Sequence, residues 1–290
     1  MKKLTVISGK GGTGKTTLVG AFASLSAGQA VLVDGDVDAA NLSLITGAEP
    51  VGKHEFYASK KAVIDPELCS ECGLCFELCR FDAINENIRV DSIKCEGCAF
   101  CAYACPEQAI DMQQKLSGHW YVSDTDYGPL VHARLGIAEE NSGKLVTTVR
   151  NRGEELAKNA DKKHLLIDGP PGIGCPVIAS LAGVDVALIV AEPSVSGIHD
   201  LERVVAVCRH FGVPAMVCIN RFDLGESQSR QIEKYCTEEN IPLVGKIPFD
   251  RNFVEAIVEG KPANEILKGS SLRGVINVWR NISESKKTIV

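Results

Sequence analysis

Long apolar runs and an excess of basic residues are both missing from this 290-residue chain. No stretch approaches the roughly 18 consecutive apolar residues that a membrane-spanning helix needs, and the few residues before the first glycine-rich loop leave no room for a secretory signal core. The 31 basic residues are outnumbered by 37 acidic ones, so no basic stripe is available for nucleic acid. We therefore expect a cytoplasmic protein that neither spans a membrane nor binds nucleic acid.

Cysteine, by contrast, is abundant, with 12 residues in the chain. A disulfide-bonded secreted protein would explain this number, but the missing secretory signal opposes that interpretation. The apolar content of 45% and the charged content of 23% are ordinary for a soluble globular protein. We therefore interpret the cysteines as reduced thiols, most of them metal ligands.

A glycine-rich loop, Gly-Lys-Gly-Gly-Thr-Gly-Lys-Thr, occupies residues 9–16. The alternating β-branched residues 4–8 predict a strand before it, and residues 16–27 predict a helix after it. This order lets loop N–H groups and the helix N-terminus converge on phosphate oxygens. Lys15 is expected to reach the β- and γ-phosphates and Thr16 to ligate Mg²⁺. The predicted nucleotide contacts are Gly11, Gly12, Thr13, Gly14, Lys15, Thr16 and Thr17.

An acidic residue follows a second buried strand, at Asp168. It ends the apolar segment 165–167 at the carboxyl edge of the expected sheet, where open α/β sheets bind ligands. Asp168 is therefore predicted to hold the Mg²⁺ shell. The Gly-Pro-Pro-Gly segment 169–172 that follows is expected to approach the γ-phosphate as a switch.

Eight of the cysteines form two runs with the same spacing, CxxCxxCxxxC. The first run spans residues 69–79 and the second spans 95–105. Such runs are typical of [4Fe–4S] ligands. Two Cys₄ zinc sites could use the same residues and are the main alternative.

Residues 10–17 resemble the deviant phosphate loop of the MinD/ParA/Mrp ATPases. The resemblance implies Mg²⁺-dependent ATP hydrolysis in a homodimer, with Lys10 reaching across the interface to the partner's nucleotide. It also implies that residues 36–41 form a first switch, in which Asp36 positions the attacking water and Asp38 supports it near Mg²⁺; an exposed helix cap is the alternative for Asp38. The same resemblance places Asn220, Pro248 and Asp250 around the adenine, although ordinary turns at strand ends would also explain these three residues.

The cysteine-rich segment resembles a bacterial two-cluster ferredoxin, in which the fourth cysteine of each run ligates the other cluster. One cluster would then be held by Cys69, Cys72, Cys75 and Cys105, and the other by Cys95, Cys98, Cys101 and Cys79. The proline that usually follows the first run is replaced by Arg80.

The predicted fold is α/β, with a doubly wound, mainly parallel sheet. Strands are expected near 3–8, 30–34, 164–168, 185–191, 214–219 and 243–247. The expected domains are an ATPase domain at 1–63 and 114–290 and an inserted 2[4Fe–4S] ferredoxin domain at 64–113. Apolar residues at helical spacing between Leu272 and Ile282 favour a final helix packed on the core over a membrane anchor, since the basic Lys286-Lys287 end is short.

The leading functional hypothesis is an ATP-dependent dimeric switch coupled to two [4Fe–4S] clusters, acting in metal or iron–sulfur cofactor assembly or in ATP-gated electron transfer. The resemblance implies a paralogous ATPase and a small nitrogenase-cofactor-like carrier as further partners. The alternative is a MinD/ParA-like positioning ATPase with redox-sensing clusters. Cys175, seven residues after Asp168, is either a further metal contact or a buried thiol beside the second switch.

Overall fold

A nine-stranded sheet organises the chain in a computed structural model that describes residues 1–136 and 142–285. The strand order is β3-β4-β5-β2-β6-β1-β7-β8-β9. From β5 to β9, each neighbouring pair is parallel. The strands are β1 (Lys2–Ser8), β2 (Ala30–Asp34), β3 (Glu49–Ile64), β4 (Ile110–Asp124), β5 (Leu130–Leu135), β6 (His164–Pro171), β7 (Val186–Ala191), β8 (Ala215–Asn220) and β9 (Leu243–Ile247).

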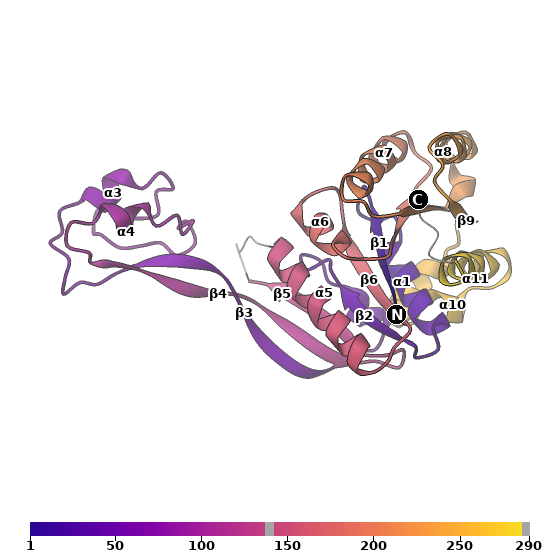
Figure 1. The fold of residues 1–290 in the computed structure, drawn as a ribbon, viewed down its shortest axis with the longest axis horizontal. Helices are drawn as coiled ribbons and strands as arrows, with labels where there is room; N and C mark the ends of the chain where they lie inside the picture. The colour runs from indigo at the N-terminus through magenta and orange to yellow at the C-terminus, as the bar shows by residue number, and fades with distance from the viewer. Residues whose placement is uncertain (137–141, 286–290) are drawn as a thin grey trace. The chain divides into compact units, whose positions relative to one another are not determined.

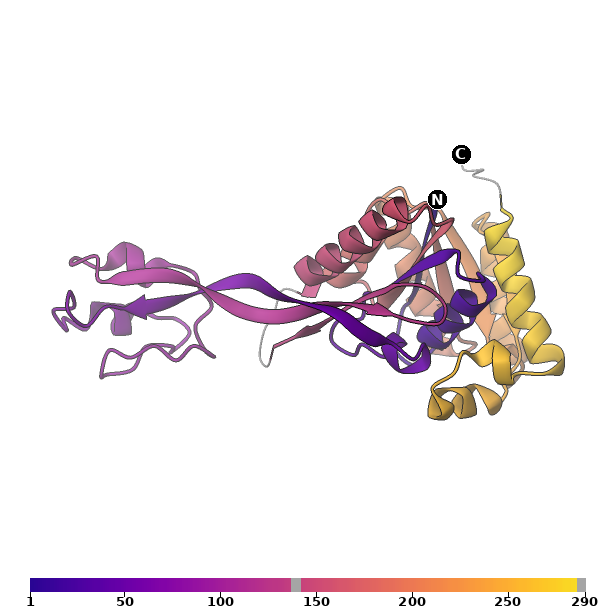
Figure 2. The same cartoon turned by 90° about the horizontal axis from the view of Figure 1, so that it is seen from below.

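The central strands are buried because helices cover both faces of the sheet. One face carries α1 (Lys15–Leu25), α9 (Asn252–Glu259), α10 (Ala263–Ile266) and α11 (Gly269–Ser283), with the short α2 (Leu42–Ile45) beside them. The other carries α5 (Ser142–Asn159), α6 (Cys175–Leu181), α7 (Val195–His210) and α8 (Glu226–Glu238). Figures 1 and 2 show α5 and α11 on opposite faces.

The sequence-based fold class is confirmed for the α/β layer structure and the mainly parallel sheet. All six predicted strands are present, as β1, β2 and β6 to β9. The prediction missed β3, β4 and β5. In β3 most side chains are exposed or half-buried, so neither a buried apolar run nor a clean alternation of polar and apolar residues marks the strand.

The chain divides into two compact units. One contains Met1–His54, Trp120–Arg134 and Ser142–Val290, and the other contains Glu55–His119 and Leu135–Asn141. The second unit includes all eight cysteines of the two runs, the short helices α3 (Leu74–Leu78) and α4 (Phe100–Ala104), and its own small core around Ala62, Ile84 and Ile110. Each of the long strands β3 and β4 contributes residues to both units.

The last described helix, α11, packs on the core as its apolar spacing predicts. Val275, Val278 and Ile282 are buried in the main hydrophobic cluster, and the Trp279 ring stacks on Phe22 of α1 with centroids 5.4 Å apart. The basic pair Lys286-Lys287 lies outside the described residues. Within 1–136 and 142–285, no helix is both long enough and apolar enough to cross a membrane.

Candidate nucleotide and metal sites

The glycine-rich loop connects β1 to α1 and takes a conformation that glycine alone adopts easily. Gly12 and Gly14 have φ values of 77° and 96°, in the left-handed region where a Cβ is strained. A Cβ on Gly14 would also lie only 2.6 Å from the Asn220 amide nitrogen. Gly11 and Gly12 face open space and are exposed, which leaves the backbone free to approach a ligand.

Lys15 begins α1 and is buried, with a relative exposure of 6%. Burial lowers the pKa of its ammonium, whereas the nearby carboxylates of Asp168 and Asp36 favour the charged form. The charged end of this predicted phosphate ligand is therefore held among the acidic residues of the site. Thr16 is half-buried and Thr17 is buried in the same helical turn.

Asp168 of β6 and Asp34, the last residue of β2, form a buried acidic pair. They are register partners in the sheet, and each is at most 1% exposed. Burial raises the pKa of Asp168 to about 7, while the Thr16 hydroxyl and the Lys15 charge oppose the rise. Neither Asp168 carboxylate oxygen has a partner with full hydrogen-bond geometry in the part of the chain that the structure describes. An orphaned buried carboxylate of this kind is suited to a divalent cation.

Asp34 is a site residue that was not predicted from the sequence. Its two oxygens accept the backbone N–H groups of Leu42 at 2.9 Å and Asp36 at 3.2 Å. Burial, and then the neighbouring Asp168, raise its pKa well above the usual range. Asp34 therefore joins the end of β2 to the start of α2 and orders the segment between them. Like Asp168, Asp34 directly follows a buried apolar run on its strand, and that was the available signal.

Asp36 and Asp38 lie in that segment but differ in their surroundings. Asp36 is half-buried, and burial raises its pKa although Lys15 opposes the shift. Asp38 is exposed. The two predicted catalytic carboxylates are therefore not equivalent in this chain: Asp36 lies near Lys15, and Asp38 faces solvent.

Asn220 ends β8 and is 5% exposed. Its amide NH₂ donates to the Thr13 carbonyl at 2.8 Å, and its amide oxygen accepts the Arg221 N–H at 3.0 Å. The predicted adenine contact thus supports the phosphate loop directly. Of the other two residues predicted near adenine, Asp250 accepts the Asn252 N–H at 3.0 Å at the start of α9, and Pro248 is half-buried after β9.

The second predicted switch is joined to the first strand. The Gly172 N–H donates to the Ser8 carbonyl at 2.9 Å, and Gly172 has a φ of 92°. A Cβ on Gly169 would lie 2.5 Å from Ile7 Cγ2, so glycine is needed there for close packing. Cys175 is exposed at the start of α6, contrary to the alternative of a buried thiol.

Lys10 forms an ion pair within its own chain that the sequence analysis did not foresee. Its ammonium lies 2.7 Å from Glu192 and 3.2 Å from the Ser194 hydroxyl. Arg221 approaches the same carboxylate at 3.3 Å. The hydrogen bond from Lys10 is the main cause of the lowered pKa of Glu192. Glu192 directly follows β7, whereas Lys10 follows β1, so only the sheet brings them together.

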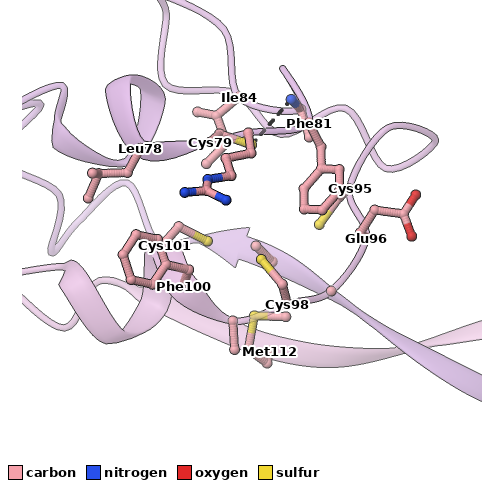
Figure 3. Close-up of a pocket in the computed structure, with 15 residues that line it drawn as sticks. Leu78, Cys79, Phe81, Ile84, Cys95, Glu96, Cys98, Phe100, Cys101 and Met112 are labelled. Atoms are coloured by element: carbon pink, nitrogen blue, oxygen red, sulfur yellow. Dashed lines mark hydrogen bonds between the residues drawn. The ribbon is translucent and has the colours of Figure 1, made fainter.

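The cysteines of the second compact unit line two cavities. The larger one, of about 380 Å³, is lined by Cys79 of the first run and by three cysteines of the second, Cys95, Cys98 and Cys101. Figure 3 shows these four side chains around one space, with Phe81, Phe100 and Met112 completing the wall. Cys98 is exposed and Cys95 is buried.

The second cavity is narrower, at about 20 Å³, and has the complementary set of cysteines. Cys105 of the second run lines it together with Cys69, Cys72 and Cys75 of the first. Each cavity thus combines three cysteines of one run with the last cysteine of the other. Among residues 1–136 and 142–285, no three His, Cys, Asp or Glu side chains converge closely enough to hold one metal ion.

A parallel sheet with a glycine-rich loop between β1 and α1, and a buried acid on the adjacent strand β6, defines a P-loop nucleotide-binding protein of the α/β class. The family model of the CobQ/CobB/MinD/ParA nucleotide binding domain matches residues 4–263. The chain belongs to this family.

Two curated relatives are similar to the chain over almost its full length. "Uncharacterized protein MJ0578" of Methanocaldococcus jannaschii is 34% identical over 292 residues, which cover 99% of this chain and 97% of the relative. "Uncharacterized protein MJ0579" of the same organism is 27% identical and covers 97% of both chains.

Solved structures show the same fold at low sequence identity. The septum site-determining protein MinD complexed with Mg-ADP from Pyrococcus horikoshii has a TM-score of 0.62 and 18% identity, covering 98% of this chain and 96% of its own. The MinD cell division protein of Aquifex aeolicus has a TM-score of 0.59 and 21% identity, covering 99% and 98%. The MinD-like fold therefore extends over almost the whole chain.

Proposed function

We propose that this protein is a Mg²⁺-dependent ATPase that forms an ATP-bound homodimer and couples the nucleotide state to two [4Fe–4S] clusters. It would act in metal or iron–sulfur cofactor assembly or in ATP-gated electron transfer. The observation that carries this proposal is the pair of four-cysteine cavities in a chain that also has a P-loop.

The residues of the nucleotide site fit Mg-ATP. The exposed backbone of Gly11 and Gly12 leaves room for phosphates, and the buried Lys15 would offset the phosphate charge. The two orphaned oxygens of Asp168 would gain a partner through the Mg²⁺ shell, to which Thr16 would add its hydroxyl. These features support ATP rather than an uncharged ligand.

Hydrolysis requires a group that orients the attacking water. Asp36 is the better placed of the two acidic candidates because it is half-buried near Lys15, whereas Asp38 is exposed. The raised pKa of Asp36 is closer to the pKa of a useful general base than the pKa of an ordinary aspartate is. Lys10 would contribute to the partner's nucleotide after exchanging Glu192 for a phosphate oxygen.

The residues of the cysteine-rich unit also fit their proposed group. A [4Fe–4S] cluster presents a separate iron to each of four thiolates, so its ligands surround a volume instead of converging on a point. The four cysteines around the 380 Å³ cavity have this arrangement, and the crossed 3+1 sets support the ferredoxin pattern in residues 64–113. When bound, the clusters would supply one-electron redox chemistry. A tetrahedral zinc site, with Zn–S distances of about 2.3 Å, would need the four sulfurs to converge.

The order of the segments along the chain supports coupling between the nucleotide site and the cluster sites. The proposed cluster domain comes after the first switch, residues 36–41, and before the second, residues 169–172. Both switch segments are expected to reorder with the γ-phosphate. The occurrence of two related proteins in M. jannaschii supports a related ATPase as a second partner. A small nitrogenase-cofactor-like carrier and a cytoplasmic setting complete the proposal.

Anaerobic purification followed by metal analysis tests this function. The proposal requires about eight iron atoms per chain and ATP hydrolysis that Lys15→Ala abolishes while the iron content stays unchanged. An Asp36→Ala protein held in the ATP state would then be used to capture partners. The identity of the bound partner would distinguish cofactor assembly from electron transfer. Zinc in place of iron, or full ATPase activity in Lys15→Ala, would overturn the proposal.

A positioning ATPase is the second candidate, and the MinD fold favours it. In that case ATP turnover would rise with lipid vesicles or DNA, and the redox state of the clusters would act only as a sensor. The net charge of −6 and the packing of α11 on the core oppose this candidate. ATPase assays with anionic vesicles and with duplex DNA distinguish the two candidates.

A further inference from the structure

The two cysteine runs fold into closely matched halves. The Ala83 N–H donates to the Cys79 sulfur at 3.4 Å, and the Ala109 N–H donates to the Cys105 sulfur at the same distance. In the turn between each pair, one residue has a positive φ, 50° at Asp82 and 49° at Gln108. The last cysteine of each run therefore has the same backbone environment.

The beginnings of the two runs match as well. The Cys69 N–H donates to the Asp65 carbonyl at 3.1 Å, and the Cys95 N–H donates to the Asp91 carbonyl at 3.0 Å. Each aspartate side chain also accepts the N–H two residues further on, at 2.9 Å and 2.8 Å. Because the backbone repeats so closely, a difference between the two sites must come mainly from side chains.

The clearest difference is one charge directly after the last cysteine. Arg80 follows Cys79 and lines the larger cavity. Pro106 follows Cys105 at the equivalent position and lines the narrower cavity. The larger cavity has one other charged lining residue, Glu96, whereas Glu107 is the charged residue that lines the narrower one. The larger cavity therefore has one more unit of positive charge.

We propose that Arg80 makes the two cluster sites unequal and gives the site of Cys79, Cys95, Cys98 and Cys101 the higher reduction potential. This inference rests on the proposed function, since it requires [4Fe–4S] clusters in both cavities. Reduction adds a negative charge to a cluster, and a nearby cation stabilises that charge. Arg80 is the tuning residue because it supplies the positive charge by which the two cavity linings differ.

The unequal potentials have a functional consequence. When one electron per protein is supplied by an external low-potential reductant, it is held at the Arg80 site. This site has an exposed cysteine, Cys98, and two aromatic side chains in its wall, Phe81 and Phe100, that are 45% and 52% exposed. The electron is therefore held at a cavity whose wall reaches solvent, where an acceptor can approach it, although Cys72 of the narrower cavity is exposed as well.

Potentiometry on the whole anaerobic protein, followed by electron paramagnetic resonance, tests this inference. The wild type should show two one-electron steps. Arg80→Gln should lower the reduction potential of the upper step by about 59 mV, which is about tenfold in the equilibrium constant of a one-electron reduction. The shift is no larger because Arg80 is exposed and water screens part of its charge. The lower step should move less. Arg80→Lys should keep most of the separation between the two reduction potentials. Arg80→Pro, which gives both runs a proline after their last cysteine, should remove it.

Arg89→Gln is the matched control, because Arg89 is also exposed in the same unit but lines neither cavity. Equal shifts in Arg80→Gln and Arg89→Gln, or no shift in Arg80→Gln at full iron content, would overturn the role of Arg80 alone. A loss of the separation in Arg80→Lys would assign the effect to packing instead of charge. A wild-type protein without iron would overturn the proposed function itself, and this inference with it.

Discussion

The Lys10 ammonium and the Glu192 carboxylate lie 2.7 Å apart within one chain. The Ser194 hydroxyl, 3.2 Å from the ammonium, and Arg221, 3.3 Å from the carboxylate, extend the contact. A lysine that reaches a partner's nucleotide must leave this arrangement first. In the proposed ATP-dependent homodimer, this ion pair would stabilise the separate protomer and oppose association.

Replacing Glu192 tests this effect on association. Glu192→Gln should tighten ATP-dependent dimerisation by up to about fivefold for each of the two protomers, because a partly exposed ion pair contributes roughly 0.2–1 kcal/mol. Sedimentation velocity with ATP at several protein concentrations measures the change. Lys10→Ala should weaken the dimer instead, and equal dimerisation of all three proteins would contradict the assigned role of Lys10.

The buried Asp168 makes stability depend on pH. Its pKa rises from 3.8 in the unfolded chain to about 7 in the folded one, so the folded protein binds this proton more tightly. The resulting stabilisation is complete below about pH 4 and is lost as the pH rises to 7. Asp168→Asn should flatten this decline and increase the free energy of unfolding at pH 8 by a few kcal/mol.

Denaturant unfolding of nucleotide-free protein between pH 5 and 8 measures this effect, at matched metal content. Mg-ATP binding should have the opposite pH dependence in the wild type, since the cation needs the ionised carboxylate. An unchanged pH slope in Asp168→Asn would show that other groups cause the decline.

Asn220 is expected to act through the phosphate loop. Asn220→Ala removes the amide that donates to the Thr13 carbonyl at 2.8 Å and leaves a buried acceptor unsatisfied, at a cost of about 1–3 kcal/mol. Affinity should fall by a similar factor for ATP and GTP when measured by calorimetry. A loss confined to ATP would show that the side chain reads adenine directly.

The crossed cavities predict which cysteines share a cluster. Cys105→Ser should remove the same spectroscopic signal as Cys72→Ser, although Cys105 belongs to the other run. Cys79→Ser should remove the same signal as Cys98→Ser. Electron paramagnetic resonance and iron analysis of the reduced variants measure these losses, with Cys208→Ser, a buried core position, as the control. The crossed arrangement would be contradicted if replacing any cysteine of one run removed the same signal.

Much of the fold could be predicted because its core strands have strong local signals. β1, β2 and β6 to β8 are short and mostly buried, so their apolar runs are visible in the sequence. In β9, at the edge of the sheet, only Val244 and Ile247 are buried. β3 and β4 have no such signal, since exposed and half-buried residues predominate in them. Pairing with a neighbouring strand, and not local preference, makes these segments strands.

The candidate sites also combine features that the sequence predicts with features that it does not. The spacing of Gly12, Gly14 and Lys15 could be interpreted from the sequence because a phosphate loop is built from consecutive residues. The contact of Glu192 with Lys10 and the contact of Asn220 with Thr13 could not be predicted from the sequence. Each depends on contacts between segments about 180 to 210 residues apart, which only the register of the sheet determines.

The sequence by itself determined the chemistry that this protein can offer: a phosphate loop, an acid after the apolar run of β6 and eight thiols with repeated spacing. Local spacing suffices for these features because neighbouring residues supply them. The tertiary structure decided which groups meet, including the crossed cysteine sets, the buried Asp34–Asp168 pair and the contact of Lys10 with Glu192. These contacts arise when strands and loops distant in the chain pack together and exclude water.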